Sequence, residues 1–117
     1  MRTRNTISAI LGGLLCLFLG SAACFGQHTP HSTFTTFDVP GASLTIAFSI
    51  NPRGDIVGDY VDASGNTHGF LLSKGKFTTI DVPGAVLTDA GGINPRGDIV
   101  GDYVDASGNT HGYLLSK

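Results

Sequence analysis

The 117-residue sequence contains no tryptophan and no glutamate, and its two cysteines, Cys16 and Cys24, lie near the start. Without later cysteines, the rest of the chain cannot form a disulfide framework or a thiolate metal site. All nine acidic residues are aspartates, a residue type that favours turns and caps over helix interiors. No apolar pattern of helical period follows residue 33. These absences indicate an all-β chain beyond that point.

Basic residues are also scarce. After residue 26, five basic residues stand against nine aspartates, which gives a net charge of −4. A chain without a basic stripe is not expected to bind nucleic acid. The sequence also lacks Gly-x-Ser-x-Gly and His-Glu-x-x-His, the signatures of common serine and zinc hydrolases. We therefore expect neither an enzyme nor a bound cofactor.

The first 26 residues have the layout of a secretory signal peptide. Arg2 and Arg4 form a short basic region, an apolar run covers residues 7–19, and small residues follow at 21–23. A membrane-spanning helix would need about 20 apolar residues, and this run is shorter. The pattern predicts an exported protein, extracellular or periplasmic.

Two cleavage positions are consistent with this signal. Cleavage after Gly26 would leave Gln27 at the new N-terminus, whereas cleavage after Ala23 would expose Cys24. The second context loosely resembles a bacterial lipobox, with Ser21 where leucine is usual. Lipidation of Cys24 would tether the protein to a membrane without changing its fold.

The rest of the chain is a near-perfect duplication. After a linker at residues 27–33, repeat 1 (34–76) is followed by repeat 2 (77–117) at an offset of 43 residues. Of 41 aligned positions, six differ: Phe37/Ile80, Ser43/Val86, Ile46/Asp89, Phe48/Gly91, Ser49/Gly92 and Phe70/Tyr113. A period of this length is typical of repeat folds, in which each unit covers its neighbour's apolar face.

Each repeat is expected to form four short strands separated by turns. Turn residues recur as Pro-Gly, Asn-Pro-Arg-Gly and Asp-Ala-Ser-Gly-Asn. The expected strands are 34–39, 44–50, 55–61 and 67–73, with their counterparts in repeat 2. Four antiparallel strands packed face to face with the next unit resemble a β-propeller blade. The fold class is thus two tandem four-stranded antiparallel blade-like repeats, a partial propeller, preceded by a signal-peptide helix.

The differences between the repeats concentrate in the second expected strand. Ile46 and Phe48 extend an apolar face that Asp89 and Gly91 interrupt in repeat 2. We expect the strand of repeat 1 to pack on protein and that of repeat 2 to be more exposed. Conserved spacing of Gly58 and Gly69 in both copies predicts close approach between packed sheets.

The motif Ile-Asn-x-Arg-Gly-x-Ile-Val-Gly-x-Tyr, followed by Asp-Ala-Ser-Gly and His-Gly-Phe-Leu, carries a family resemblance. It occupies residues 50–60 with 62–71, and again 93–103 with 105–114. It is similar to the HAF repeat, a family of probable extracellular bacterial repeats named for a His-Ala-Phe triplet. The triplet here is His-Gly-Phe and then His-Gly-Tyr. The resemblance implies export and a propeller-like fold, and it brings no activity or catalytic residues.

A closed propeller has roughly four to eight blades, and this chain has only two repeat units. Three explanations stay open: copies of the chain associate into a ring, the chain is a truncated remnant of a longer array, or the fold is an open pair. Near-identical units can pair across chains as readily as within one. A homo-oligomer is therefore among the expected partners.

Several side chains suggest sharper roles. Residues 53–55 and 96–98 spell Arg-Gly-Asp, although the local chemistry requires only a turn there. Asp55, Asp59, Asp98 and Asp102 are weak candidates for a calcium site, together with Asp62 and Asp105, but no EF-hand loop is present. The alternative for all of them is a solvated strand end.

One histidine and one tyrosine recur in each repeat. His68 and His111 are expected to tie a strand to a turn rather than to act as ligands. Tyr60 and Tyr103 could line a carbohydrate-binding rim or belong to the core.

These observations favour a secreted β-repeat module with a binding or structural role. Its ligand is not assigned by the sequence, and a cell-surface or glycan ligand is among the candidate partners. The alternative of another class is a secreted hydrolase acting on glycans through a pair of aspartates across a cleft. A remnant without an independent fold is the third possibility. Activity on polysaccharides and mass in solution separate the three.

Overall fold

The computed structural model describes residues 30–117. The expected signal peptide, residues 1–26, and both cleavage positions lie outside the described residues. Residues 30–35, which belong to a separate N-terminal unit, have no regular secondary structure, and all strands lie in the unit Thr36–Lys117. Among residues 30–117, no helix is long and apolar enough to cross a membrane.

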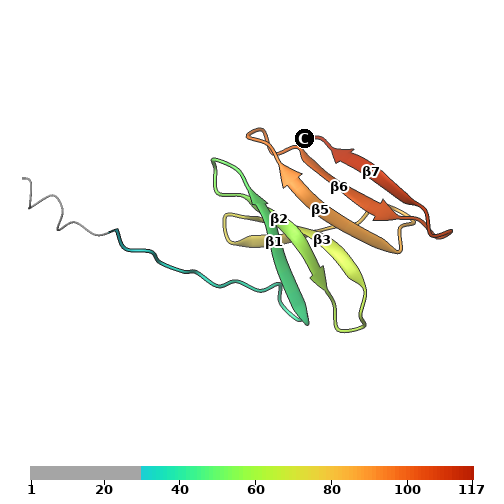
Figure 1. Ribbon diagram of the computed structural model, residues 1–117, viewed down its shortest axis with the longest axis horizontal. Coiled ribbons are helices and arrows are strands. Elements are labelled where there is room, and N and C mark those ends of the chain that lie inside the picture. Colours follow the sequence, from blue (N-terminus) through green and yellow to red (C-terminus); the bar gives the residue numbers. More distant parts are fainter. Residues whose placement is uncertain (1–29) are drawn as a thin grey trace, which may run out of the picture. The chain divides into compact units, whose positions relative to one another are not determined.

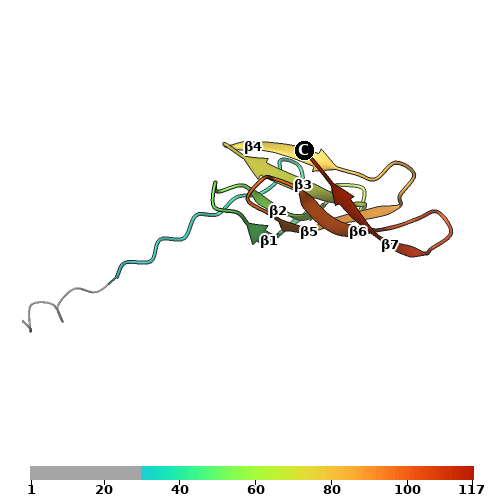
Figure 2. The ribbon, with the colours of Figure 1, turned by 90° about the horizontal axis from the view of Figure 1, so that it is seen from above.

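The folded unit is all-β and consists of two antiparallel sheets (Figure 1). The first sheet has the order β1-β2-β3-β4 and the second the order β5-β6-β7, each running as a simple meander. Figure 2 shows β4 on the far side of β3 from β2. The strands are β1 Leu44–Ile50, β2 Ile56–Val61, β3 Thr67–Ser73, β4 Lys76–Ile80, β5 Leu87–Ile93, β6 Ile99–Val104 and β7 Thr110–Leu115.

The turns form as their residues predict. Gly41 and Gly84 adopt φ of 80° and 83° behind a proline, and the amide two residues before each following strand bonds back across the turn, which is type II geometry. Gly54 and Gly65 take φ near 90° in two further turns of repeat 1, and Gly75 takes φ of 79° in the turn between β3 and β4. A side chain at these positions would be strained, so glycine places the strand boundaries.

The sheets do not coincide with the sequence repeats, which corrects the expectation of four strands in each unit. Residues 34–39 form no strand, and their counterpart β4 pairs with β3 of the preceding repeat, Leu72 facing Phe77 and Gly69 facing Ile80. Each complete sheet therefore takes three strands from one repeat and the outer strand from the next. The second sheet consequently has three strands.

The expectation for the second strand of each repeat is also wrong, and the reverse holds. β5 lies against β1, β2 and β3 of the other sheet, with Thr88 and Ala90 buried. β1 instead exposes its large apolar side chains, each between 39% and 64%: Leu44, Ile46, Phe48 and Ile50. The physical reason is position, because β5 packs on the first sheet, whereas within residues 30–117 nothing covers the large apolar side chains of β1.

The core between the sheets is small. Val57, Ile80, Ala90 and Ile99 are buried together, and Tyr113 packs on them. A separate aromatic cluster on the first sheet consists of the rings of Phe37, Phe70 and Phe77. Two apolar clusters of this size leave a large share of the apolar side chains at the two ends of the stack exposed.

The two glycines singled out from the sequence have different neighbours. A β-carbon on Gly69 would lie 3.2 Å from that of Ala90, so this glycine does allow close approach of the sheets. A β-carbon on Gly58 would lie 1.9 Å from the carbonyl oxygen of Ile46 in the same sheet. Gly58 therefore accommodates the β-bulge in β1 between Ala47 and Ser49, not sheet packing.

Candidate functional site

Asp55 and Asp98, two of the four metal candidates, fix their own turns. Asp55 accepts hydrogen bonds from Asn51 Nδ2 at 3.0 Å and Ser73 Oγ at 2.6 Å. These donors, Ser73 first, lower the pKa of Asp55 to about 2. Asp98 accepts from Asn94 Nδ2 at 2.9 Å, and its pKa is also lowered to about 2. Both carboxylates stabilise strand connections.

The same contacts explain the Arg-Gly-Asp tripeptides. Arg53 Nε lies 3.2 Å from Asp55 Oδ2, and Arg96 lies 2.7 Å from Asp98. The Asp55 side chain is only 9% exposed and already holds several donors. The tripeptide is therefore part of a closed turn in which arginine and aspartate bind each other.

Asp59 and Asp102, the other two candidates, meet a third carboxylate at Asp89. Burial, followed by the charges of Asp89 and Asp102, raises the pKa of Asp59 to about 6. Burial likewise raises the pKa of Asp89. Within residues 30–117, no group of three metal-ligating side chains has the arrangement needed to hold an ion. The structure thus separates the four candidates into two turn residues and two members of a packed acidic cluster.

The histidines act as expected, since each joins a strand to a turn. His68 Nε2 lies 2.8 Å from Asp62 Oδ2, and His111 Nε2 lies 2.8 Å from Asp105 Oδ2. The hydrogen bond to Asp62, supported by one to Asp81, raises the pKa of His68. Asp62 in turn has a pKa lowered to about 2, first by His68.

Tyr60 and Tyr103 stack on these imidazoles, with ring centroids 5.1 Å and 5.0 Å apart. Both tyrosines are half-buried on the sheet surface rather than in the core. Tyr60 also joins its hydroxyl to Thr79 Oγ1 at 2.8 Å, which links β2 to β4 across β3. The pair of rings therefore supports the sheet surface near its outer strand.

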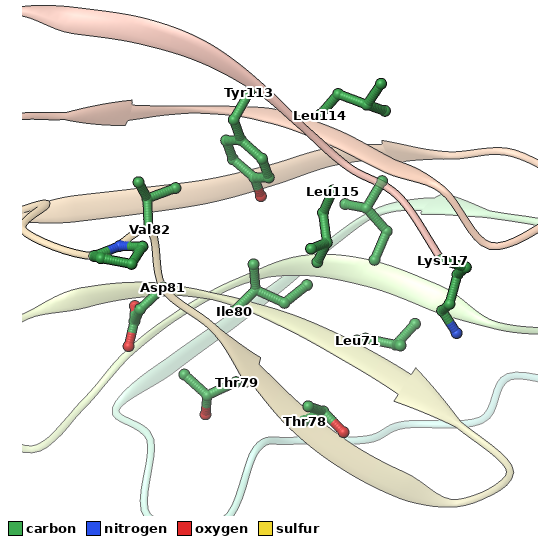
Figure 3. A pocket seen from close by; sticks show the side chains of 12 residues that line it. Leu71, Thr78, Thr79, Ile80, Asp81, Val82, Tyr113, Leu114, Leu115 and Lys117 are labelled. Atoms are coloured by element: carbon green, nitrogen blue, oxygen red, sulfur yellow. The ribbon is translucent and has the colours of Figure 1, made fainter.

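An apolar cavity lies elsewhere, between β4 and β7. It has a volume of about 640 Å³ and an apolar lining that includes Leu71, Ile80, Ile99, Tyr113 and Leu115. Figure 3 shows Tyr113 and Leu115 pointing from β7 toward Ile80, while Leu114 points away. We call this cavity the β4–β7 cleft. None of the clustered carboxylates at 59, 89 and 102 lines it.

The outer edge of β7 borders this cleft. The corresponding edge of β3 is covered by β4, whereas no described strand pairs with the outer edge of β7. Leu114 and Leu115 are 64% and 46% exposed there, although their counterparts Leu71 and Leu72 are half-buried. An open edge bordered by apolar side chains is a template for another strand.

Sequence reasoning did not find this site, because the residues of β7 and β3 are nearly identical. One signal for it was available in the sequence. The first expected strand lies at the start of each repeat, where it can pair with the last strand of the preceding repeat and leave the last strand of the final repeat without such a partner.

The comparisons with known proteins leave the site to be interpreted from its geometry. No protein-family model, no curated protein and no solved structure matches this chain.

Proposed function

We propose that this protein is an exported β-sheet binding module that takes up an extended polypeptide strand along β7. The observation that carries the proposal is the open outer edge of β7 beside the β4–β7 cleft. Strand addition of this kind uses main-chain hydrogen bonds for affinity and side-chain pockets for specificity. Export and a blade-like repeat fold are the expectations that the signal-like start and the HAF-like motifs add to it.

The chemistry of the cleft supports a peptide with alternating residues. Tyr113 and Leu115 lie on the inner face of β7 with Ile80 across from them, which suits one aromatic or branched side chain. Thr78 and Thr79 line the same cleft from β4. A strand whose alternate residues are apolar and hydroxyl-bearing would match both kinds of lining.

A synthetic peptide with the sequence of residues 75–82 tests this function, because in the chain this segment covers the same edge of β3. The labelled peptide is titrated with the full chain carrying Phe34→Asp, and binding is followed by the fluorescence anisotropy of the peptide. We expect saturable binding that Leu115→Asp weakens at least roughly 10-fold and that Val86→Asp leaves unchanged. Val86 is a matched control because it is exposed and apolar but lies outside the cleft.

A second peptide has proline in place of Thr79 and is otherwise identical. It keeps the apolar side chains but lacks the main-chain N–H donor at that position. It should bind at least roughly 10-fold more weakly if main-chain pairing provides the affinity. Equal binding of both peptides, or no binding of either, would refute the proposed function.

A further inference from the structure

We infer that the strand received by β7 is residues 33–37 of a second copy of this chain, paired as β4 is paired with β3. This inference rests on the proposed function and names the partner of the same cleft. The two copies are then related head to tail, with the start of one completing the second sheet of the other.

Residues 38–43, which follow the proposed strand, have the same hydrogen bonds as residues 81–86, which follow β4. Val39 donates its amide to Thr45 Oγ1 at 3.1 Å, and Val82 donates to Thr88 Oγ1 at the same distance. Ala42 and Ala85 close the same turn by bonding back over 3.0 Å. Residues 38–43 therefore sit on the first sheet as residues 81–86 sit on the second.

Phe37 shows the same equivalence in its packing. Its ring lies 6.4 Å from that of Phe70, and its counterpart Ile80 packs with Tyr113, the counterpart of Phe70. Ile80 also belongs to β4 and pairs with Gly69 of the preceding sheet. Residues 33–36, in contrast, are exposed and belong to no strand, whereas their counterparts 76–79 lie in β4. The segment is thus anchored as β4 is, but without the neighbour that β4 has.

The β3–β4 register fixes the pairing of the second copy. In this register, each β3 residue is replaced by its β7 counterpart and each β4 residue by its counterpart at the start of the second copy. The resulting pairs are Gly112 with Phe37, Tyr113 with Thr36, Leu114 with Thr35 and Leu115 with Phe34. The strand would run antiparallel to β7 along its exposed outer edge.

Phe34 supplies the side chain that the cleft lacks. Its counterpart Phe77 lies 5.6 Å from Phe70 and 6.3 Å from Phe37. One repeat later, the corresponding neighbours are Tyr113 and Ile80, and both line the cleft. Phe34 is 93% exposed in the chain, so docking it there would remove a large apolar ring from water.

A hydroxyl pair predicts a second contact. Tyr60 bonds Thr79 of β4, but Tyr103 makes no such bond within residues 30–117. In the proposed register, Thr36 of the second copy occupies the position of Thr79. The Tyr103 hydroxyl would then gain the partner that Tyr60 has.

The imidazoles predict a third contact. His68 Nδ1 lies 2.9 Å from Asp81, just after β4, in addition to its turn partner. For His111, the described residues provide only the turn partner, Asp105. Asp38 of the second copy is the counterpart of Asp81 and would complete the pattern.

The two ends of the stack carry complementary apolar surfaces. Val100 and Leu114 are 51% and 64% exposed on the second sheet, whereas their counterparts Val57 and Leu71 pack against the core. At the other end, β1 is the counterpart of β5, which packs on the first sheet, and the large apolar residues of β1 are exposed. Strand donation would bring these two surfaces together, and large exposed apolar patches commonly mark such interfaces.

Contacts of this head-to-tail kind either close into a ring or continue as a filament. A propeller has roughly four to eight blades, so roughly two to four chains would close one. Both outcomes use the same strand exchange.

Mass in solution tests the inference on the full chain. Light scattering at about 100 µM should show an oligomer for the parent and for Val86→Asp. Phe34→Asp should shift the mass to that of a monomer, with an unchanged far-ultraviolet dichroism spectrum that shows retained folding. A monomeric parent, or a folded Phe34→Asp chain of unchanged mass, would overturn strand exchange.

Cysteine cross-linking tests the register independently. In a background with both native cysteines changed to serine, a Thr35→Cys chain is mixed with a Leu114→Cys chain. Directly opposed residues have β-carbons about 5 Å apart, which is near disulfide geometry. The mixture should yield at least roughly 10-fold more mixed disulfide than Thr36→Cys mixed with Leu114→Cys, and equal yields would contradict the register.

The two proposals fail separately. If the residue 75–82 peptide binds but Phe34→Asp changes neither mass nor cross-linking, the cleft takes a strand from another polypeptide and the self-pairing is wrong. If the peptide does not bind, the proposed function itself falls, and with it the inference.

Discussion

The acidic cluster of Asp59, Asp89 and Asp102 should make this fold less stable at neutral pH than at mildly acidic pH. Asp59 lies two residues after the fully buried Val57 on β2, near Asp89 and Asp102. Its Oδ1 is buried without a hydrogen-bond partner. Changing Asp59 to asparagine removes the charge, keeps the shape and adds a donor that can face the neighbouring carboxylates, so Asp59→Asn should stabilise the folded chain.

The sign and size follow from the pKa. Burial, and then the charges of Asp89 and Asp102, raise the pKa of Asp59 from 3.8 to about 6. Because the folded chain holds this proton more tightly than the unfolded chain, the resulting stability is present below about pH 4 and is lost as the pH rises through about 6. The shift corresponds to about 3 kcal/mol at pH 7.5. Partial exposure of the side chain reduces the expected effect to about 1 kcal/mol.

Urea unfolding followed by far-ultraviolet dichroism measures this effect. Both chains carry Phe34→Asp so that association does not contribute. Asp59→Asn should raise the free energy of unfolding by about 1 kcal/mol at pH 7.5 and leave it nearly unchanged at pH 4. A gain of equal size at both pH values would indicate a packing effect, and no gain at pH 7.5 would refute the electrostatic reasoning.

Three further predictions concern packing, and thermal unfolding measures each. Gly69→Val should destabilise the chain by about 2 kcal/mol. Gly112→Val should change stability by less than about 0.5 kcal/mol, because a β-carbon there would lie 3.8 Å from its nearest neighbour; equal losses would contradict the sheet packing. Gly58→Ala should cost about 3 kcal/mol because backbone atoms block the methyl group, and a neutral result would exclude the bulge geometry. Asn51→Ala should cost about 1 kcal/mol more than Asn94→Ala, because Asn51 also donates to the Asn94 carbonyl; equal costs would remove this link between the turns.

Local features of the fold were predictable because they depend on neighbouring residues. The strands at 44–50, 67–73 and 87–93 begin and end where the sequence predicts. Their turns contain glycines with positive φ, and the turn after residue 73 also holds Lys74 with φ of 52°. The role of His68 was also predictable, since its turn partner Asp62 is only six residues away.

The assembly of strands into sheets was not predictable from one repeat. The segments 34–39 and 77–82 differ at one position, yet only the second contributes a strand. The difference arises because β4 has β3 as a neighbour, and the earlier segment has no preceding unit among the described residues. Pairing between units is a property of position in the array, which near-identical sequences cannot reveal.

The differences between the repeats take on a new meaning in this arrangement. β5 packs on the first sheet through Thr88 and Ala90, both of which are buried, and its Gly91 and Gly92 stand where β1 has Phe48 and Ser49. β1 keeps the larger residues on a surface that no described element covers. If the two strands faced identical neighbours, the same volume would suit both. The larger side chains of β1 therefore match surroundings that differ from those of β5. Under the proposed strand exchange, the junction between two copies need not repeat the junction between the two sheets of one chain.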